Sequence, residues 1–311
     1  MKFQDFYFSI TIILSMILGL VFSNQFILLA PFTIFFLMAI LFLSALKFNF
    51  KEIIASVDST KKQVVILLAT IFTLVFLPII AFYLTDLIYP TLAPAFFILS
   101  LAPVGMTVPF LVDIMKGDKG LALILVIFTS LLAPFTIPFL INLILGGIVN
   151  INLIGMFISL TKIIFIPFIL AFVVKYLFPE KIKQTSKFFN NISTISLGLL
   201  LATIVATHSN IIIPLFSRDG LFYLITLLFL FAFTYILSYL FFYKIEDQKR
   251  FAIIICSVFM NFTLMIVMAN KFFYNYDEIV IPIVLSVIPW SISLIILRQI
   301  ARKNPSKLKK K

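Results

Sequence analysis

Charge, cysteine and histidine are scarce in this sequence, and each scarcity excludes a class of protein. Only 12% of the 311 residues are charged and 63% are hydrophobic, whereas charged residues make up about a quarter of a soluble globular domain. The single cysteine, Cys256, excludes an intramolecular disulfide framework and a cysteine-based zinc site, and the single histidine, His208, leaves few metal ligands. With a mean hydropathy of +1.21, the chain is expected to be a polytopic membrane protein.

Motifs that carry enzymatic chemistry are also missing. The chain contains no GxSxG, no HExxH and no aspartate-rich motif. An enzyme would need a nucleophile with a base, paired carboxylates or a metal site. We therefore do not expect an enzyme, and we expect no bound cofactor.

What the sequence has is a series of long apolar runs. Ten of them approach the roughly 20 residues that a helix needs to span a bilayer. They cover residues 7–22, 27–46, 63–85, 91–115, 120–146, 152–178, 188–207, 220–243, 251–270 and 279–297. The first run does not end in a small-x-small site, so we expect it to be a span and not a cleaved signal peptide.

The basic residues between these runs predict the topology. If the N-terminus is cytoplasmic, all but three of the 24 Lys and Arg residues lie on cytoplasmic segments, where positive charge is retained. The exceptions are Arg218, Lys271 and Lys162. We expect a multi-pass protein of the cell membrane with both termini cytoplasmic. The net charge of +12 is then a topology signal, with membrane lipid and not nucleic acid facing the basic tail.

The region from Leu101 to Pro138 interrupts this pattern. Pro103, Gly105 and Pro109 fall inside a hydrophobic run, and such a combination should unwind a helix. Unwound backbone at membrane depth is tolerated only where it is buried in protein or lines a polar cavity. The break is therefore the first candidate for a binding site, and a merely kinked helix is the alternative.

Three short stretches resemble the bile acid:sodium symporter family. One is Lys116-Gly117-Asp118 followed by Leu131-Leu132-Ala133-Pro134 and Pro138, and another is residues 35–53, FFLMAILFLSALKFNFKEI. The third is Asn261 within VFMNFTLMIVMAN. The resemblance implies a core of helices 3 to 5 and 8 to 10, in which the broken helices 4 and 9 cross, and a panel of helices 1, 2, 6 and 7.

The expected fold is an all-α polytopic membrane protein with a single transporter domain over residues 1–311. Ten helices with both ends on one side divide into two sets of five, and an odd number in each set gives the two halves opposite orientations. The predicted inverted repeats cover approximately residues 1–147 and 148–311.

Polar side chains inside the spans need a partner or a cavity. We expect the following to bind substrate: Thr107, Pro109, Thr129, Lys162, Asn261 and Thr263. For the threonines the alternative is a hydrogen bond to a carbonyl of their own helix. The amide of Asn261 has more groups to satisfy, which favours a role at the crossing. His208, beside Ser209 and Asn210, is expected to be solvated or interfacial.

Lys162 is the one charge that the topology places near the bilayer midplane, about eleven residues into the sixth span. It could pair with an acid, lose its proton, or face a water-filled cavity between panel and core. We favour the cavity, where the ammonium would offer an anionic substrate its counter-charge.

The sequence departs from the sodium-coupled relatives where they bind sodium. There the resemblance implies a Ser-Asn pair, a Ser and a Thr, and a Glu and a Gln. The aligned positions of this chain hold Val108, Pro109, Ala122, Val126, Cys256 and Met260. Hard cations need oxygen ligands, so we expect no metal site and no sodium coupling.

The function that these observations favour is secondary active transport of a small organic solute, with an organic anion as the expected substrate. One alternative is an arsenite-type or auxin-efflux-type carrier of related fold, for which Cys256 is the only support. Another is a membrane scaffold or receptor that no longer transports.

Overall fold

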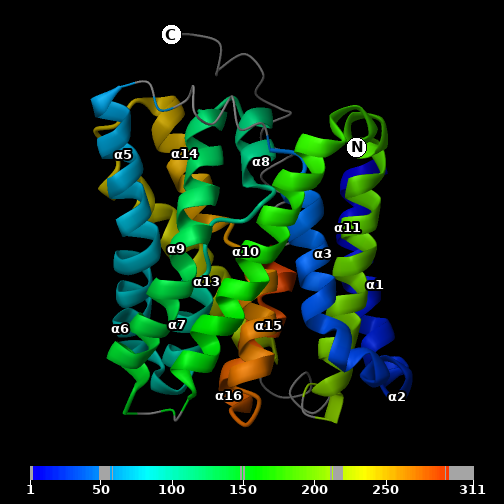
Figure 1. Ribbon diagram of the computed structural model, residues 1–311. Coiled ribbons are helices and arrows are strands. Elements are labelled where there is room, and N and C mark those ends of the chain that lie inside the picture. The colour runs from blue at the N-terminus through cyan, green and yellow to red at the C-terminus, as the bar shows by residue number, and fades with distance from the viewer. Residues whose placement is uncertain are drawn as a thin grey trace.

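The computed structural model describes residues 3–48, 57, 59–147, 149, 151–210, 212, 220–290 and 292–293, and these residues are almost entirely helical (Figure 1). The elements in chain order are α1 (Phe3–Val21), α2 (Ser23–Phe26), the 3-10 helix η1 (Ile27–Phe32), α3 (Thr33–Ala45), α5 (Thr60–Ile71), the π-helical turn η2 (Phe72–Phe76), α6 (Leu77–Ile88), the 3-10 turn η3 (Pro90–Leu92), α7 (Ala93–Ser100), α8 (Val108–Ile114), α9 (Lys119–Leu145), α10 (Leu153–Leu177), α11 (Pro179–Thr207), α13 (Gly220–Phe241), α14 (Asp247–Val258), α15 (Phe262–Phe272) and α16 (Asp277–Leu285).

Several of these helices can cross a membrane. Six segments of the described chain are long and apolar enough, namely Ser23–Ala45, Thr60–Ile88, Lys119–Leu145, Leu153–Leu177, Pro179–Thr207 and Phe222–Phe241. Helices suit such sequences because lipid offers no partner to an unpaired backbone N–H or C=O. The protein is therefore an integral multi-pass membrane protein, and the ten-helix inverted repeat stays a prediction. The last expected run, residues 279–297, lies partly outside the described residues.

Two groups of helices stand side by side. In Figure 1 the first group, formed by α1, α3, α10 and α11, occupies the centre and right of the view. These are the helices that the family resemblance assigns to a panel, and we call them the panel group. Their packing is close: a Cβ atom on Gly19 of α1 would lie 2.4 Å from the carbonyl oxygen of Ala202 on α11. Small residues permit this approach of helix backbones in membranes.

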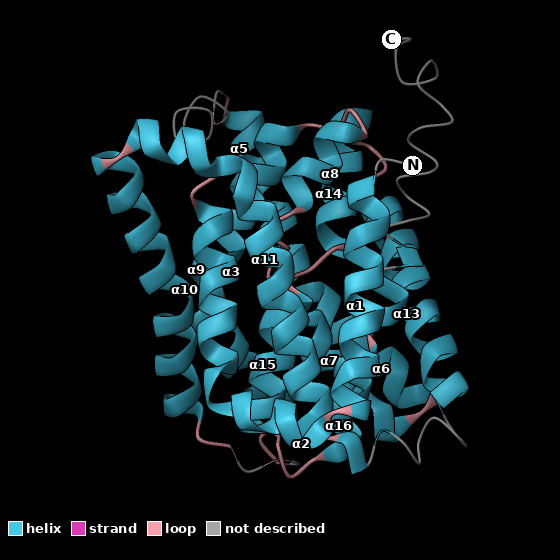
Figure 2. Ribbon diagram, turned by 90° about the vertical axis from the view of Figure 1, so that its right-hand side faces the viewer, coloured by secondary structure: helices cyan, strands magenta, loops and turns pink. Residues whose placement is uncertain are grey.

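The second group contains α5 to α9 and α13 to α16, and we call it the core group. α9 packs against α5, α8 and α14, and it also contacts α10 of the panel group. An ion pair of 3.1 Å between Lys62 and Asp118 joins the beginnings of α5 and α9, with both side chains largely buried. Figure 2 shows the helices aligned along one axis, with loop segments inside the bundle about halfway along it.

Candidate functional site

The first of these interior loops is the break that the sequence predicts. α7 ends at Ser100, residues 101–107 are not helical, and α8 begins at Val108. Pro103 and Gly105 lie within the unwound segment, whereas Pro109 lies in the first turn of α8. A proline is tolerated there because the first turn of a helix leaves its N–H groups without intrahelical acceptors. The expectation that Pro109 helps to unwind the helix is therefore wrong, since Pro109 instead starts the next one.

A second break separates α14 from α15. It covers residues 259–261, and Asn261 is the N-cap of α15, where its side-chain Oδ1 accepts a hydrogen bond of 3.2 Å from the backbone N–H of Leu264. This cap satisfies one of the four N–H groups that open every helix. Asn261, which is half-buried, is therefore the last residue of the break and also has a structural role as the cap of α15.

The two breaks meet inside the core group. Val104 and Met260 form an antiparallel β-bridge. On one side of it the N–H of Gly105 donates to the carbonyl of Phe259 over 3.0 Å, and on the other the N–H of Asn261 donates to the carbonyl of Pro103 over 2.7 Å. Unwound backbone groups that would be costly inside a membrane are thereby paired with each other. We call this junction the crossing.

The crossing requires a glycine. A Cβ atom on Gly105 would lie 2.8 Å from the carbonyl oxygen of Phe259 and 3.1 Å from that of Met260. The first distance is shorter than a Cβ atom tolerates, and the contacted atoms belong to backbone. Gly105 therefore allows the close approach of the two chains, a use of glycine that is distinct from helix breaking.

Thr129 of α9 fixes the crossing from the side. Its hydroxyl accepts a hydrogen bond of 3.0 Å from the backbone N–H of Val104 and donates one of 2.7 Å to the carbonyl of Leu125. Thr129 and Val104 are both completely buried. The hydroxyl thus bonds to its own helix, as the alternative interpretation expects, and also holds the unwound segment of another element.

The remaining candidate residues are less central. Thr107 is exposed at the N-cap position of α8 and makes no side-chain cap hydrogen bond. Thr263 is half-buried in the first turn of α15. Lys162 is exposed on α10, on the same face as Ile158 and Ile166, which are 44% and 41% exposed. The crossing thus brings Thr129 and Asn261 together, with Thr107 and Thr263 on the helices that begin there, while Lys162 lies on the panel group.

The turn Lys116-Gly117-Asp118, which carries the family resemblance, ends α8 and begins α9. Lys116 adopts a positive φ of 60°, and the N–H of Gly117 donates to the carbonyl of Val112 over 2.9 Å. This is the Schellman arrangement that closes a helix. Asp118 caps α9 through a hydrogen bond of 2.8 Å from the N–H of Leu121. The residues of this turn that carry the family resemblance therefore have a structural role: they fix the direction in which α8 leads into α9.

Sequence reasoning missed the polar pair His208 and Asn270. His208 is only 2% exposed, and its Nε2 lies 2.8 Å from the side-chain oxygen of Asn270 on α15. The expectation of a solvated or interfacial histidine is therefore wrong. The residues next to His208 in the chain do not indicate this contact, because its partner comes 62 residues later.

The residues at the aligned sodium positions do not fit a sodium ion. Val108, Ala122, Val126 and Cys256 are completely buried, and Met260 is 6% exposed. Pro109 is also buried. None of these side chains carries an oxygen atom, which is the ligand that a hard cation requires.

A comparison with protein families finds a match over the first part of the chain. The model described as "Sodium Bile acid symporter family" matches residues 33–216, more than half of the chain. The matched region includes the first break, the turn at Lys116 and Thr129, whereas the second break lies beyond it. A comparison with curated proteins finds no significant match.

Proposed function

The chain belongs to the sodium bile acid symporter family, and from this premise we propose that it is a secondary active transporter of a small organic anion that works by alternating access. Members of the family are membrane transporters and not enzymes. The observation that carries the proposal is the crossing, in which two broken helices meet inside the bundle through main-chain hydrogen bonds. Discontinuous helices of this kind form the substrate sites of many secondary transporters.

The two helix groups supply the parts that alternating access needs. The crossing lies in the core group, and the panel group contacts it through helices such as α10. Rocking of one group against the other would expose a site at the crossing to each side of the membrane in turn.

Two lysines, one on each helix group, favour an anionic substrate. The ammonium of Lys271, at the end of α15, donates to the hydroxyl of Ser159 on α10 over 2.9 Å. Lys162 follows Ser159 by one helical turn, about 14 Å from the beginning of α10. Among the described residues, no acidic side chain forms an ion pair with either lysine. An ammonium at such a depth marks a functional path more often than a structural one.

We further propose that transport does not depend on sodium, because apolar side chains occupy the positions of the expected ligands. The thiol of Cys256 is completely buried, which gives no support to the alternative of an arsenite-type or auxin-efflux-type carrier. The remaining alternative, a scaffold or receptor without transport, is an outcome of the experiment that follows.

The experiment measures uptake into proteoliposomes from a panel of bile acids, short carboxylates and sulfonates. We expect saturable uptake of at least one anion, at the same rate in sodium chloride as in choline chloride. Protein-free liposomes are the control for leakage. The absence of uptake for every anion would refute organic-anion transport, and faster uptake in sodium would refute sodium independence alone.

A labelling experiment tests the proposed orientation. Cysteines placed at Asn24 and Asn210 should react with an impermeant maleimide in intact cells, and cysteines at Asp58 and Gln184 should not. The native Cys256 is completely buried and adds little background. Reaction at the second pair in intact cells would refute the cytoplasmic placement of the N-terminus.

A further inference from the structure

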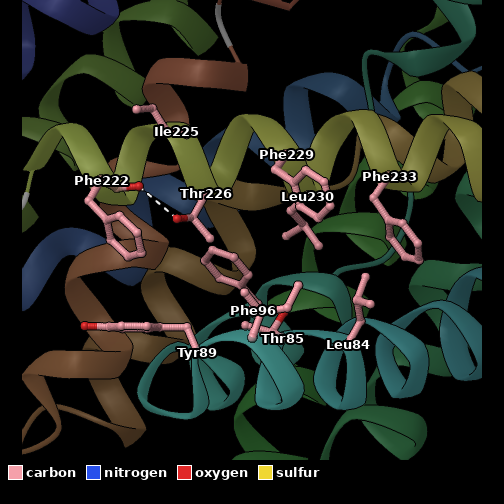
Figure 3. A pocket seen from close by; sticks show the side chains of 11 residues that line it. Leu84, Thr85, Tyr89, Phe96, Phe222, Ile225, Thr226, Phe229, Leu230 and Phe233 are labelled. Atoms are coloured by element: carbon pink, nitrogen blue, oxygen red, sulfur yellow. Dashed lines mark hydrogen bonds between the residues drawn. The ribbon is translucent and has the colours of Figure 1, made fainter.

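An apolar groove, separate from the crossing, lies between α6, α7 and α13 (Figure 3). Its volume is about 270 Å³. In Figure 3 it runs between α6 and α13, from the rings of Phe222 and Tyr89 at one end to Leu84 and Phe233 at the other. Its lining includes Leu84, Thr85 and Tyr89 on one side and Phe222, Thr226 and Phe233 on the other.

The groove opens sideways, toward the surface of a membrane span. Phe96 and Leu230 form its floor and are 2% and 7% exposed, whereas Phe222, Ile225 and Phe229 at its rim are 45%, 56% and 54% exposed. The rim residues belong to Phe222–Phe241, one of the segments that can cross the membrane. In a multi-pass membrane protein, the medium in contact with such a rim is lipid.

The lining selects an apolar occupant. None of the described residues that line the groove carries a charged side chain. The hydroxyl of Thr226 donates to the carbonyl of Phe222 on its own helix over 2.8 Å, as the dashed line in Figure 3 shows. Sites for small molecules with polar groups normally provide a few convergent polar partners. The described lining of this groove offers only the hydroxyls of Thr85, Tyr89 and Thr226, and the last is bonded to its own helix. The groove is therefore unsuited to the anionic substrate proposed above and suited to a hydrocarbon chain.

The dimensions of the groove match a hydrocarbon chain in one leaflet. From Phe222 to Phe233 the axis of α13 rises about 16 Å, close to half of the roughly 30 Å hydrocarbon core of a bilayer. At roughly 30 Å³ for each water-sized group, the cavity holds about nine such groups, and a methylene is of similar size. Tyr89 closes one end, with its ring 5.1 Å from that of Phe222. Tyrosines are enriched at the membrane–water interface, so this end marks the headgroup side.

We propose that the groove binds one acyl chain of a phospholipid from the leaflet in which α13 begins, and that this chain supports the crossing through Leu230. Leu230 lines the groove and also a small cavity on its other side, together with Met260 and Phe262. Met260 is the residue that bridges to Val104. An acyl chain in the groove therefore lies one side chain away from the second break. The lipid site does not depend on the proposed function. Only the effect of the lipid on transport rests on the proposed function.

The test fills the groove and compares it with a matched position elsewhere. Thr226→Trp places an indole in the groove, and Thr136→Trp is the control. Both threonines are partly exposed on spanning helices and donate to the carbonyl four residues before, Thr226 over 2.8 Å and Thr136 over 3.2 Å. The probe is dioleoyl phosphatidylcholine, added to detergent-purified protein, and native mass spectrometry counts the lipid retained by each chain. Size-exclusion chromatography verifies folding, and Leu84→Trp fills the same groove from α6 if Thr226→Trp is not monodisperse.

We expect the parent and Thr136→Trp to retain one phospholipid, and Thr226→Trp to retain about tenfold less, a change equivalent to ~1.4 kcal/mol. Equal retention by Thr226→Trp and Thr136→Trp would mean unspecific lipid around the protein and would overturn the site. Loss of lipid without any change in anion uptake would overturn the support of the crossing through Leu230. If the parent takes up no anion, the proposed function fails while the retention result still decides the lipid site.

Discussion

Replacement of Gly105 by alanine should loosen the crossing and lower the thermal stability of the protein. The added Cβ would lie 2.8 Å from the carbonyl oxygen of Phe259 and 3.1 Å from that of Met260. Both atoms are backbone, so the two breaks must move apart. That movement also lengthens the hydrogen bond from the Gly105 N–H to Phe259, which is 3.0 Å long in the parent.

The magnitude follows from three terms. Overpacking a tight site costs about 1–3 kcal/mol, and weakening one buried hydrogen bond costs ~1 kcal/mol. The lower entropy of the unfolded chain with alanine returns at most ~1 kcal/mol. The net loss of about 1–3 kcal/mol corresponds, at ~2 °C per kcal/mol for a large domain, to a fall in melting temperature of about 2–6 °C.

The measurement is the apparent melting temperature of detergent-purified protein, followed by fluorescence-detected chromatography at one fixed heating time. Gly147→Ala is the matched control, because a Cβ atom at Gly147 meets nothing within 4 Å. That variant should melt with the parent. If Gly105→Ala melts at or above the temperature of Gly147→Ala, the crossing is not closed by the contact described here.

Three other substitutions test the panel group, the lateral support of the crossing and the anion. Gly19→Leu should destabilise the protein by about 1–3 kcal/mol or more, because its Cβ would meet the Ala202 carbonyl at 2.4 Å; a melting temperature equal to that of the parent would contradict the packing of α1 on α11. Thr129→Val should lower the stability by about 1–3 kcal/mol, because it leaves the buried N–H of Val104 without its acceptor. The melting temperature of Thr129→Ser should stay within 2 °C of the parent, at ~2 °C per kcal/mol. Equal melting temperatures of the two variants would show that the hydroxyl of Thr129 does not support the crossing. Lys162→Met should keep the melting temperature of the parent, since the side chain is exposed. It should weaken anion binding about tenfold or more, because a hydrogen bond to a charged group contributes ~1.5–3 kcal/mol. Lys162→Arg is the control, and unchanged binding by the Met variant would show that Lys162 does not contact the substrate.

The sequence located the first break because proline and glycine act on the backbone locally. Pro103 and Gly105 disrupt a helix wherever they stand, so their effect can be read without knowing the neighbours. The second break contains neither residue, and only Asn261 and the family resemblance pointed to it. The bridge between Val104 and Met260 joins apolar residues that are distant in the chain, and nothing in either residue type predicts that pairing.

Side-chain surroundings were harder to predict than the course of the backbone. Ser209 and Asn210 suggested water around His208, but its partner Asn270 comes from another helix, and tertiary contact decided its burial. The depth of Lys162 along α10 could be predicted from its place in the apolar run, and the structure adds the face, which is shared with exposed isoleucines. Whether that face meets a water-filled cavity depends on how the two helix groups move, which a pattern along one helix does not encode.

The crossing is held by main-chain atoms, and this has a consequence for how such a protein can diversify. The two hydrogen bonds that form the bridge between the breaks use the backbone of Pro103, Gly105, Phe259 and Asn261, and the hydroxyl of Thr129 adds a side-chain hydrogen bond to Val104. Side chains around the junction can therefore be exchanged over evolutionary time without dissolving it, provided that the glycine stays. Related proteins can therefore differ in their ion ligands and in their substrates while they keep the same crossing.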